Sequence, residues 1–131
     1  MSALESCELE TIDMRTLAGA RRVTAWRRGD WAVHRLINRD GWTISHVPSG
    51  QSTALAFGAA EQACAAMTEI ALLRNDWAVM RREEFQPLYP TFVAIAARHG
   101  GTALPIHPLA AALARRDFRP DLNGYAALAG P

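Results

Sequence analysis

The sequence predicts an α+β fold in which an antiparallel meander of three or four strands, at about 21–57, packs on a helix at about 59–74 and is followed by C-terminal helices. Two observations carry this prediction. Between 21 and 57, β-branched and aromatic residues are separated by compact turn signals. Residues 59–74 are rich in alanine and other strong helix formers.

The size and composition of the chain indicate one folding unit. It has 131 residues, of which 50% are hydrophobic and 21% are charged, which is ordinary for a globular domain. We therefore expect a single domain over 1–131, with the meander and its helix in 15–75 and a helical C-terminal part in 76–131.

Three turn signals divide the meander. Gly29-Asp30 suits a two-residue hairpin loop, because glycine accepts a positive φ. The segments 38–41 and 48–50 are rich in Asn, Asp, Ser, Pro and Gly, which are typical of turns. The strands are expected near 21–28, 31–37, 42–47 and 51–57.

Paired residues on neighbouring strands share a face, so the pairing can be derived. If Arg28 opposes Trp31 and Ile37 opposes Trp42, one face is apolar and the other is mixed. The apolar, core-facing set is Trp26, Trp31, Val33, Ile37, Trp42 and Ile44, with Arg35 and His46 as its polar exceptions. The outward-facing set is Arg21, Val23, Arg27, His34, Leu36, Thr43, Ser45 and Val47.

The helix at 59–74 carries an apolar stripe that should pack on the tryptophan face. Glu61 and Gln62 stand in its first turn and Asn75 ends it. The stripe consists of Ala60, Ala63, Met67, Ile70 and Ala71.

The C-terminal part predicts shorter elements. Trp77, Val79 and Met80 begin an apolar element, and a helix over Thr91–His99 should end at Gly100-Gly101. A second helix is expected from Pro108 to Arg116, and a short turn from Pro120.

Several classes of protein are excluded by what the sequence lacks. No window approaches the ~18 apolar residues of a membrane span, and the acidic start is unlike a signal peptide, so we expect a cytoplasmic protein without membrane contact. Cys7 and Cys64 follow no ligand spacing, so reduced thiols are the favoured interpretation.

Motifs for catalysis, metal binding and cofactors are also lacking. The chain has no GxSxG, HExxH or GxGxxG motif and no lysine at all. His34 and His46 point to opposite faces in the derived pairing, and neither His99 nor His107 has a partner at ligand spacing. We expect no enzyme, no metal and no cofactor; a site assembled from distant residues is the open alternative.

Charge is segregated along the chain although the net charge is only +1. Residues 1–13 hold four acids and no base, and residues 15–39 hold seven arginines and one acid. This pattern indicates either an anionic partner or internal ion pairs between the two segments.

The leading hypothesis is a non-enzymatic accessory protein that binds nucleic acid through the mixed sheet face. A solvated outer face without a partner is the plain alternative. The functional alternative is a bacterial, phage or plasmid protein that docks on another protein as an inhibitor or subunit. An uncovered strand at 21–28 or 51–57 would allow a homodimer through a sheet edge. The expected binding residues are Arg21, Arg22, Arg27, Arg28, His34, Arg39, Thr43 and Ser45.

The stretch Leu55-Ala56-Phe57-Gly58-Ala59-Ala60-Glu61-Gln62-Ala63 looks like the passage from the last strand into the helix of a known module. In pattern, residues 31–71 resemble the three-stranded-sheet-plus-helix module of AP2-like DNA-binding domains and integrase arm-binding domains. The resemblance implies DNA contact through the sheet, with Arg27 as the matching type of residue.

Overall fold

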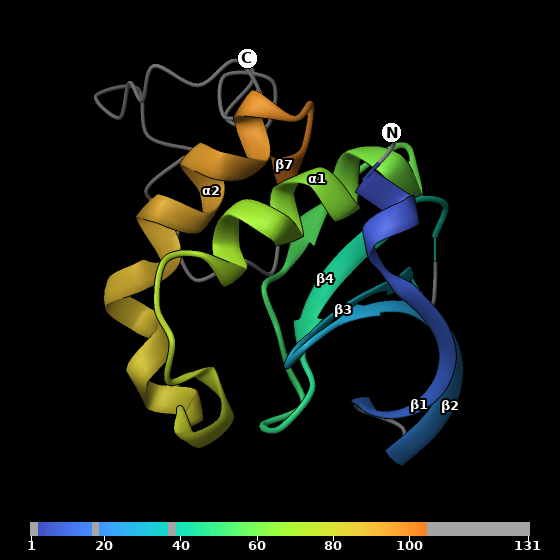
Figure 1. The fold of residues 1–131 in the computed structure, drawn as a ribbon, viewed down its shortest axis with the longest axis horizontal. Helices are drawn as coiled ribbons and strands as arrows, with labels where there is room; N and C mark the ends of the chain where they lie inside the picture. The colour runs from blue at the N-terminus through green and yellow to red at the C-terminus, as the bar shows by residue number, and fades with distance from the viewer. Residues whose placement is uncertain (1–2, 17–18, 37–38, 105–131) are drawn as a thin grey trace.

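The computed structural model describes residues 3–16, 19–36 and 39–104, and it confirms the α+β fold class. An antiparallel five-stranded sheet packs on helix α1, which lies between the sheet and helix α2 (Figure 1). The sheet order follows the chain: β1 (Glu8–Thr16), β2 (Gly19–Arg28), β3 (Trp31–Arg35), β4 (Trp42–His46) and β5 (Gln51–Ser52). Ile37, the expected helix at 108–116 and the expected turn at 120 lie outside the described residues.

The acidic start of the chain forms the outermost strand, which the sequence analysis did not predict. After a short 3-10 helix, η1 (Ala3–Ser6), strand β1 pairs with β2 along its whole length, from Glu8 opposite Arg27 to Thr16 opposite Gly19. Acids on β1 therefore lie across from arginines on β2. Strand 21–28 is consequently an inner strand, and the expectation that it could be an uncovered edge is wrong.

The derived pairing is confirmed between β2 and β3 and shifted between β3 and β4. Arg28 opposes Trp31 as expected, whereas Trp42 opposes Arg35 and not Ile37. The shift is two residues, and the side-chain period of a strand is also two. The residues that these two pairings describe on β2, β3 and β4 therefore keep the side of the sheet assigned to them.

The expected fourth strand at 51–57 is divided in two. Ala54 has a φ of 57° and turns the chain between β5 and β6 (Leu55–Ala56). Strand β6 pairs with β7 (Thr102–Ala103) in a separate two-stranded sheet, and Phe57, directly after β6, forms an isolated antiparallel bridge with Trp42 of β4. A positive φ is rare for alanine, so an alanine at position 54 did not predict a turn inside the expected strand.

Helix α1 (Ala60–Ala71) covers the tryptophan face, as expected. Ala63, Met67 and Ile70 are fully buried against Trp31 and its neighbours, while Ala60 and Ala71 at the helix ends are half-buried. Cys64 and Ala66, which lie outside the expected stripe, are also fully buried. The stripe is wider than predicted because α1 contacts α2 as well as the sheet.

The segment after α1 is built from 3-10 turns and one α-helix: η2 (Trp77–Val79), η3 (Arg82–Leu88) and α2 (Tyr89–Arg98). Trp77 and Met80 are buried as expected, but Val79 is 74% exposed. Helix α2 begins slightly before its expected start and ends at Arg98, and the chain then turns at Gly100, whose φ is 79°. In the described part of the chain, no helix has the length and apolar character needed to span a bilayer.

Candidate functional site

Two arginines of β2 are paired with acids of β1. Arg27 donates from Nη1 to Glu10 Oε1 at 3.0 Å and from Nε to the Gly29 carbonyl oxygen at 2.8 Å. Arg22 lies 3.5 Å from Asp13 in a fully solvated pair. These two pairs offset part of the charge segregation along the sequence, by the internal ion pairing that was one of its two explanations.

The other expected basic residues have different environments. Arg28 donates from Nη1 to the Ser6 hydroxyl at 3.0 Å. Arg39 is exposed in the turn between β3 and β4 and has no ion-pair partner among the described residues. The side chain of Arg21 lies outside the described part of the structure. The expected site residues therefore do not form one open cationic surface.

The expected polar face is buried, so the prediction that its side chains look outward is wrong. His34, Thr43 and Ser45 have exposed fractions of 5%, 3% and 0%. The long β1–β2 hairpin curves away from the rest of the sheet (Figure 1). A second small buried cluster fills this side of the sheet and consists of Ile12, Ala25 and Ala32, with Val23 and Val47 packed against it.

His34 is held inside this face by two hydrogen bonds. Its Nδ1 donates to the Arg35 carbonyl oxygen at 2.9 Å, and its Nε2 accepts from the Ser45 hydroxyl at 2.9 Å. Burial lowers the pKa of His34, and the hydrogen bond to the Arg35 carbonyl only partly opposes this. His34 is therefore a neutral, internally bonded side chain, which suits a structural role.

A groove of about 390 Å³ opens on the opposite face of the sheet, beside the part that α1 covers. Leu9 of β1 is 57% exposed at one wall, and Trp42 of β4 is half-buried in another. The Arg35 guanidinium lies over the Trp42 ring, 4.8 Å from its centroid. The groove is lined by Leu9, Thr24, Arg35 and Trp42, which strand alternation places on the tryptophan face, and by Val23, which alternation places on the other face.

The groove adjoins an open strand. Strand β1 is the first in the sheet order and, among the described residues, pairs only with β2. The backbone N–H and C=O groups of alternate residues in this nine-residue strand therefore face away from the sheet. An apolar groove beside a long edge strand can accept a further extended segment.

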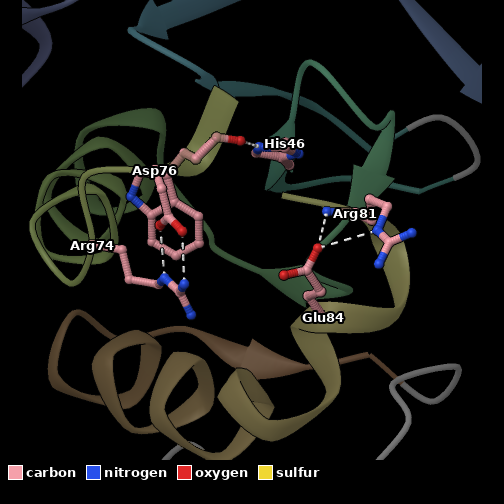
Figure 2. A network of polar contacts seen from close by, with 6 residues as sticks. His46, Arg74, Asp76, Arg81 and Glu84 are labelled. Atoms are coloured by element: carbon pink, nitrogen blue, oxygen red, sulfur yellow. Dashed lines mark hydrogen bonds and ion pairs between the residues drawn. The ribbon is translucent and has the colours of Figure 1, made fainter. Parts of the chain in front are cut away.

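His46 is the other buried histidine, and it joins the meander to η2. Figure 2 shows its ring at the carbonyl of the η2 segment: Nε2 donates to the Trp77 carbonyl oxygen at 2.6 Å. Its Nδ1 accepts from the Ser49 hydroxyl at 2.8 Å. Burial lowers the pKa of His46, against the opposing effects of the Trp77 carbonyl and then of Asp30.

This serine–histidine pair has the connectivity of an activated nucleophile. However, the His46 side chain is fully buried, and its ring lies 4.9 Å from that of Phe85 and 5.1 Å from that of Trp31. The Ser49 hydroxyl also accepts the backbone N–H of Gln51 at 3.1 Å, inside the turn before β5. The pair therefore fastens this turn onto η2.

Two surface ion pairs hold the segment that carries η2 and η3 (Figure 2). Arg74 donates two hydrogen bonds of 2.8 Å to the carboxylate of Asp76, and this contact lowers the pKa of Asp76. The Arg81 guanidinium lies 3.5 Å from Glu84 Oε1, which also accepts the backbone N–H of Arg81 at 2.9 Å at the start of η3.

In the described part of the chain, no group of three or more His, Cys, Asp or Glu side chains could hold a metal ion.

The groove was not singled out from the sequence. Its signal in the sequence was Arg35, the cationic one of the two polar exceptions on the tryptophan face.

No protein-family model, curated protein or solved structure matches this chain.

Proposed function

We propose that this chain is a non-enzymatic binding protein that docks on another protein, holding an extended segment of its partner between strand β1 and the groove. The proposal rests on the exposure of Leu9. Its side chain is 57% exposed on an open edge strand and lines a groove of about 390 Å³ together with Trp42. Apolar surface of this kind gains free energy when a partner removes it from water.

Main-chain pairing would supply the affinity. An extended segment can add to the outer edge of β1, because the backbone groups there have no strand partner in the described part of the structure. Alternate side chains of the added strand would then fall on the same face as Leu9. The groove would select among these side chains.

Arg35 indicates the chemistry that the groove selects. Its side chain is exposed, it stacks on Trp42, and it has no carboxylate partner among the described residues. A guanidinium at the wall of an apolar groove favours a segment that carries an apolar side chain and a carboxylate. The proposed ligand is therefore an extended, apolar and acidic segment of a protein.

The test is a selection of binders from a random peptide library displayed on phage. Selected peptides should combine apolar and acidic residues, and Leu9→Glu should weaken their binding by roughly tenfold or more. Leu72→Glu is the matched control, because Leu72 is 76% exposed at the end of α1, away from the groove. Binders that tolerate Leu9→Glu, or that lose as much affinity with Leu72→Glu, would overturn the proposal.

Nucleic-acid binding is the second candidate, favoured by Arg35 and Arg39, two exposed arginines without carboxylate partners in the described residues. A mobility shift with duplex DNA that falls steeply with salt would support it. In this version Arg39→Ala weakens the shift and Arg27→Ala leaves it intact, because Arg27 is bound to Glu10. If Arg27→Ala abolishes the shift, the DNA-binding surface would instead be the mixed sheet face expected from the sequence. If no shift is seen even at low salt, nucleic-acid binding is ruled out.

A further inference from the structure

The two cysteines of this chain are brought together by the way η1 sits on α1. The backbone N–H of Ala3 donates to Glu61 Oε1 at 2.6 Å, and that of Leu4 donates to Oε2 at 3.4 Å. Cys64 follows Glu61 by three residues, so it lies on the same side of α1. Cys7 directly follows η1, and its backbone N–H donates to the Leu4 carbonyl oxygen at 3.0 Å.

The two thiols have unequal surroundings. Cys64 is fully buried, whereas Cys7 is half-buried and packs against the cluster that contains Cys64. The Cys7 thiol also lies 3.5 Å from the Ala3 carbonyl oxygen, to which it donates. Burial raises the pKa of the Cys64 thiol to about 12, and the hydrogen-bonded Cys7 thiol beside it contributes to the rise. Both thiols are free in this structure.

We infer that Cys7 and Cys64 form a site of reversible oxidation, at which a peroxide converts the two thiols into an intramolecular disulfide. In the first step the Cys7 sulfur attacks the O–O bond, which gives a sulfenic acid on Cys7 and releases water. In the second step the Cys64 thiolate attacks the Cys7 sulfur, the S–S bond forms, and the hydroxyl leaves as a second water. The two sulfurs lose two electrons in total, and the peroxide gains them.

The order of these steps follows from burial. Peroxide can reach the half-buried Cys7 but not Cys64, whose exposed fraction is 0%. Because the thiolate is the attacking species, a Cys64 thiol that resists ionisation makes the second step slow at neutral pH. The sulfenic acid on Cys7 should therefore live long enough to be trapped.

The disulfide would fasten the start of β1 to α1. Cys7 immediately precedes Glu8, the first residue of the edge strand. A bond from there to α1 closes a loop that contains all five strands of the main sheet, and long loops gain the most from closure. We expect the oxidised protein to melt roughly 5–15 °C higher than the reduced protein.

The experiment treats the folded, full-length chain with hydrogen peroxide and measures its intact mass without reductant. The expected result is a monomer that is lighter by two hydrogen atoms, whose tryptic map joins the peptides holding Cys7 and Cys64, and that dithiothreitol restores. In Cys64→Ala, dimedone should label Cys7 after peroxide treatment. Cys7→Ser should acquire neither the disulfide nor the label.

Three results would overturn the inference. These are an unchanged mass, a disulfide that forms only between two chains, and oxidation of Cys7 to sulfinic acid without any bond to Cys64. The wild-type mass decides between these outcomes, so the test does not depend on whether the Cys64→Ala variant folds.

Discussion

The indole of Trp31 on β3 meets the indole of Trp77 on η2 edge to face, with ring centroids 4.9 Å apart and planes at 82°. The Trp31 ring also lies 5.8 Å from that of Phe92 on α2. It lies 6.0 Å from the ring of Phe85 on η3 as well, so one side chain of the sheet contacts three of the elements that follow α1. Edge-to-face contacts of this kind add to the free energy of burial.

Trp31→Ala should therefore lower the free energy of unfolding by about 3–5 kcal/mol, because the 1% exposed ring would leave a cavity that its neighbours cannot fill. Denaturant unfolding followed by circular dichroism measures the change. Val79→Ala is the matched control, since Val79 belongs to η2 but is 74% exposed, and it should change stability by less than about 0.5 kcal/mol. Equal losses in the two variants would contradict this account of the core.

Gly101 leaves room for the ring of Phe57. A Cβ atom at position 101 would lie 2.4 Å from Phe57 Cε2, and Phe57 is itself 2% exposed and unable to move aside. Gly101→Ala should therefore cost about 2–3 kcal/mol of stability. At Gly58 the nearest atom to such a Cβ is Gln62 Oε1, 4.0 Å away, so Gly58→Ala should be nearly neutral. Thermal melts of the two variants and of the wild-type protein measure the difference. A neutral Gly101→Ala would contradict the close packing.

His34 and His46 should make the fold less stable in mild acid. Burial lowers the pKa of both, so the unfolded chain takes up protons at these positions before the folded chain does. Their stabilising effect is complete above the unfolded pKa of about 6.5 and is lost as the pH falls below it, by at most about 2 kcal/mol for each histidine near pH 5.

The measurement compares the free energy of unfolding at neutral pH and at mildly acidic pH for wild type and His46→Gln. His46→Gln should be less stable at neutral pH, because the contact with Trp77 is altered, and its stability should vary less with pH. A pH dependence as steep as that of the wild-type protein would show that His46 does not contribute to it.

The Arg27–Glu10 pair should contribute little to the free energy of unfolding, even though it occupies the Arg27 guanidinium that an anionic partner would otherwise bind. Both side chains are about one-third exposed, so a double-mutant cycle with Arg27→Ala and Glu10→Ala should give a coupling of roughly 0.5 kcal/mol. The cycle for Arg22 and Asp13, whose side chains are 79% and 72% exposed, should give a coupling near zero. A larger coupling for the exposed pair would contradict this ranking.

Several features could be predicted from local sequence because short-range physics governs them. The Gly29-Asp30 turn placed Arg28 opposite Trp31, and alternation then assigned Trp31, Val33 and Ile44 correctly to the core. The length and alanine content of 59–74 were enough for α1. These signals act over a few residues and do not depend on the rest of the fold.

Other features arise only when distant segments meet. Glu8–Thr16 reads as an acidic tail, and it becomes a strand because the arginine-bearing β2 offers a complementary partner. The polar side chains of Ser45 and His34 predict a solvent-exposed face. They are buried instead, because the β1–β2 hairpin curves and Ile12 and Ala25 pack on that side of the sheet.

The groove and the cysteine pair also form only where segments that are distant in the sequence meet. Leu9 and Trp42 line one groove, and Cys7 lies against Cys64, through contacts between residues far apart in the chain. Periodicity tells which way a side chain points from its own strand or helix. Which other side chain it then meets depends on how the strands curve and how the helices stack, and that is a property of the assembled tertiary structure.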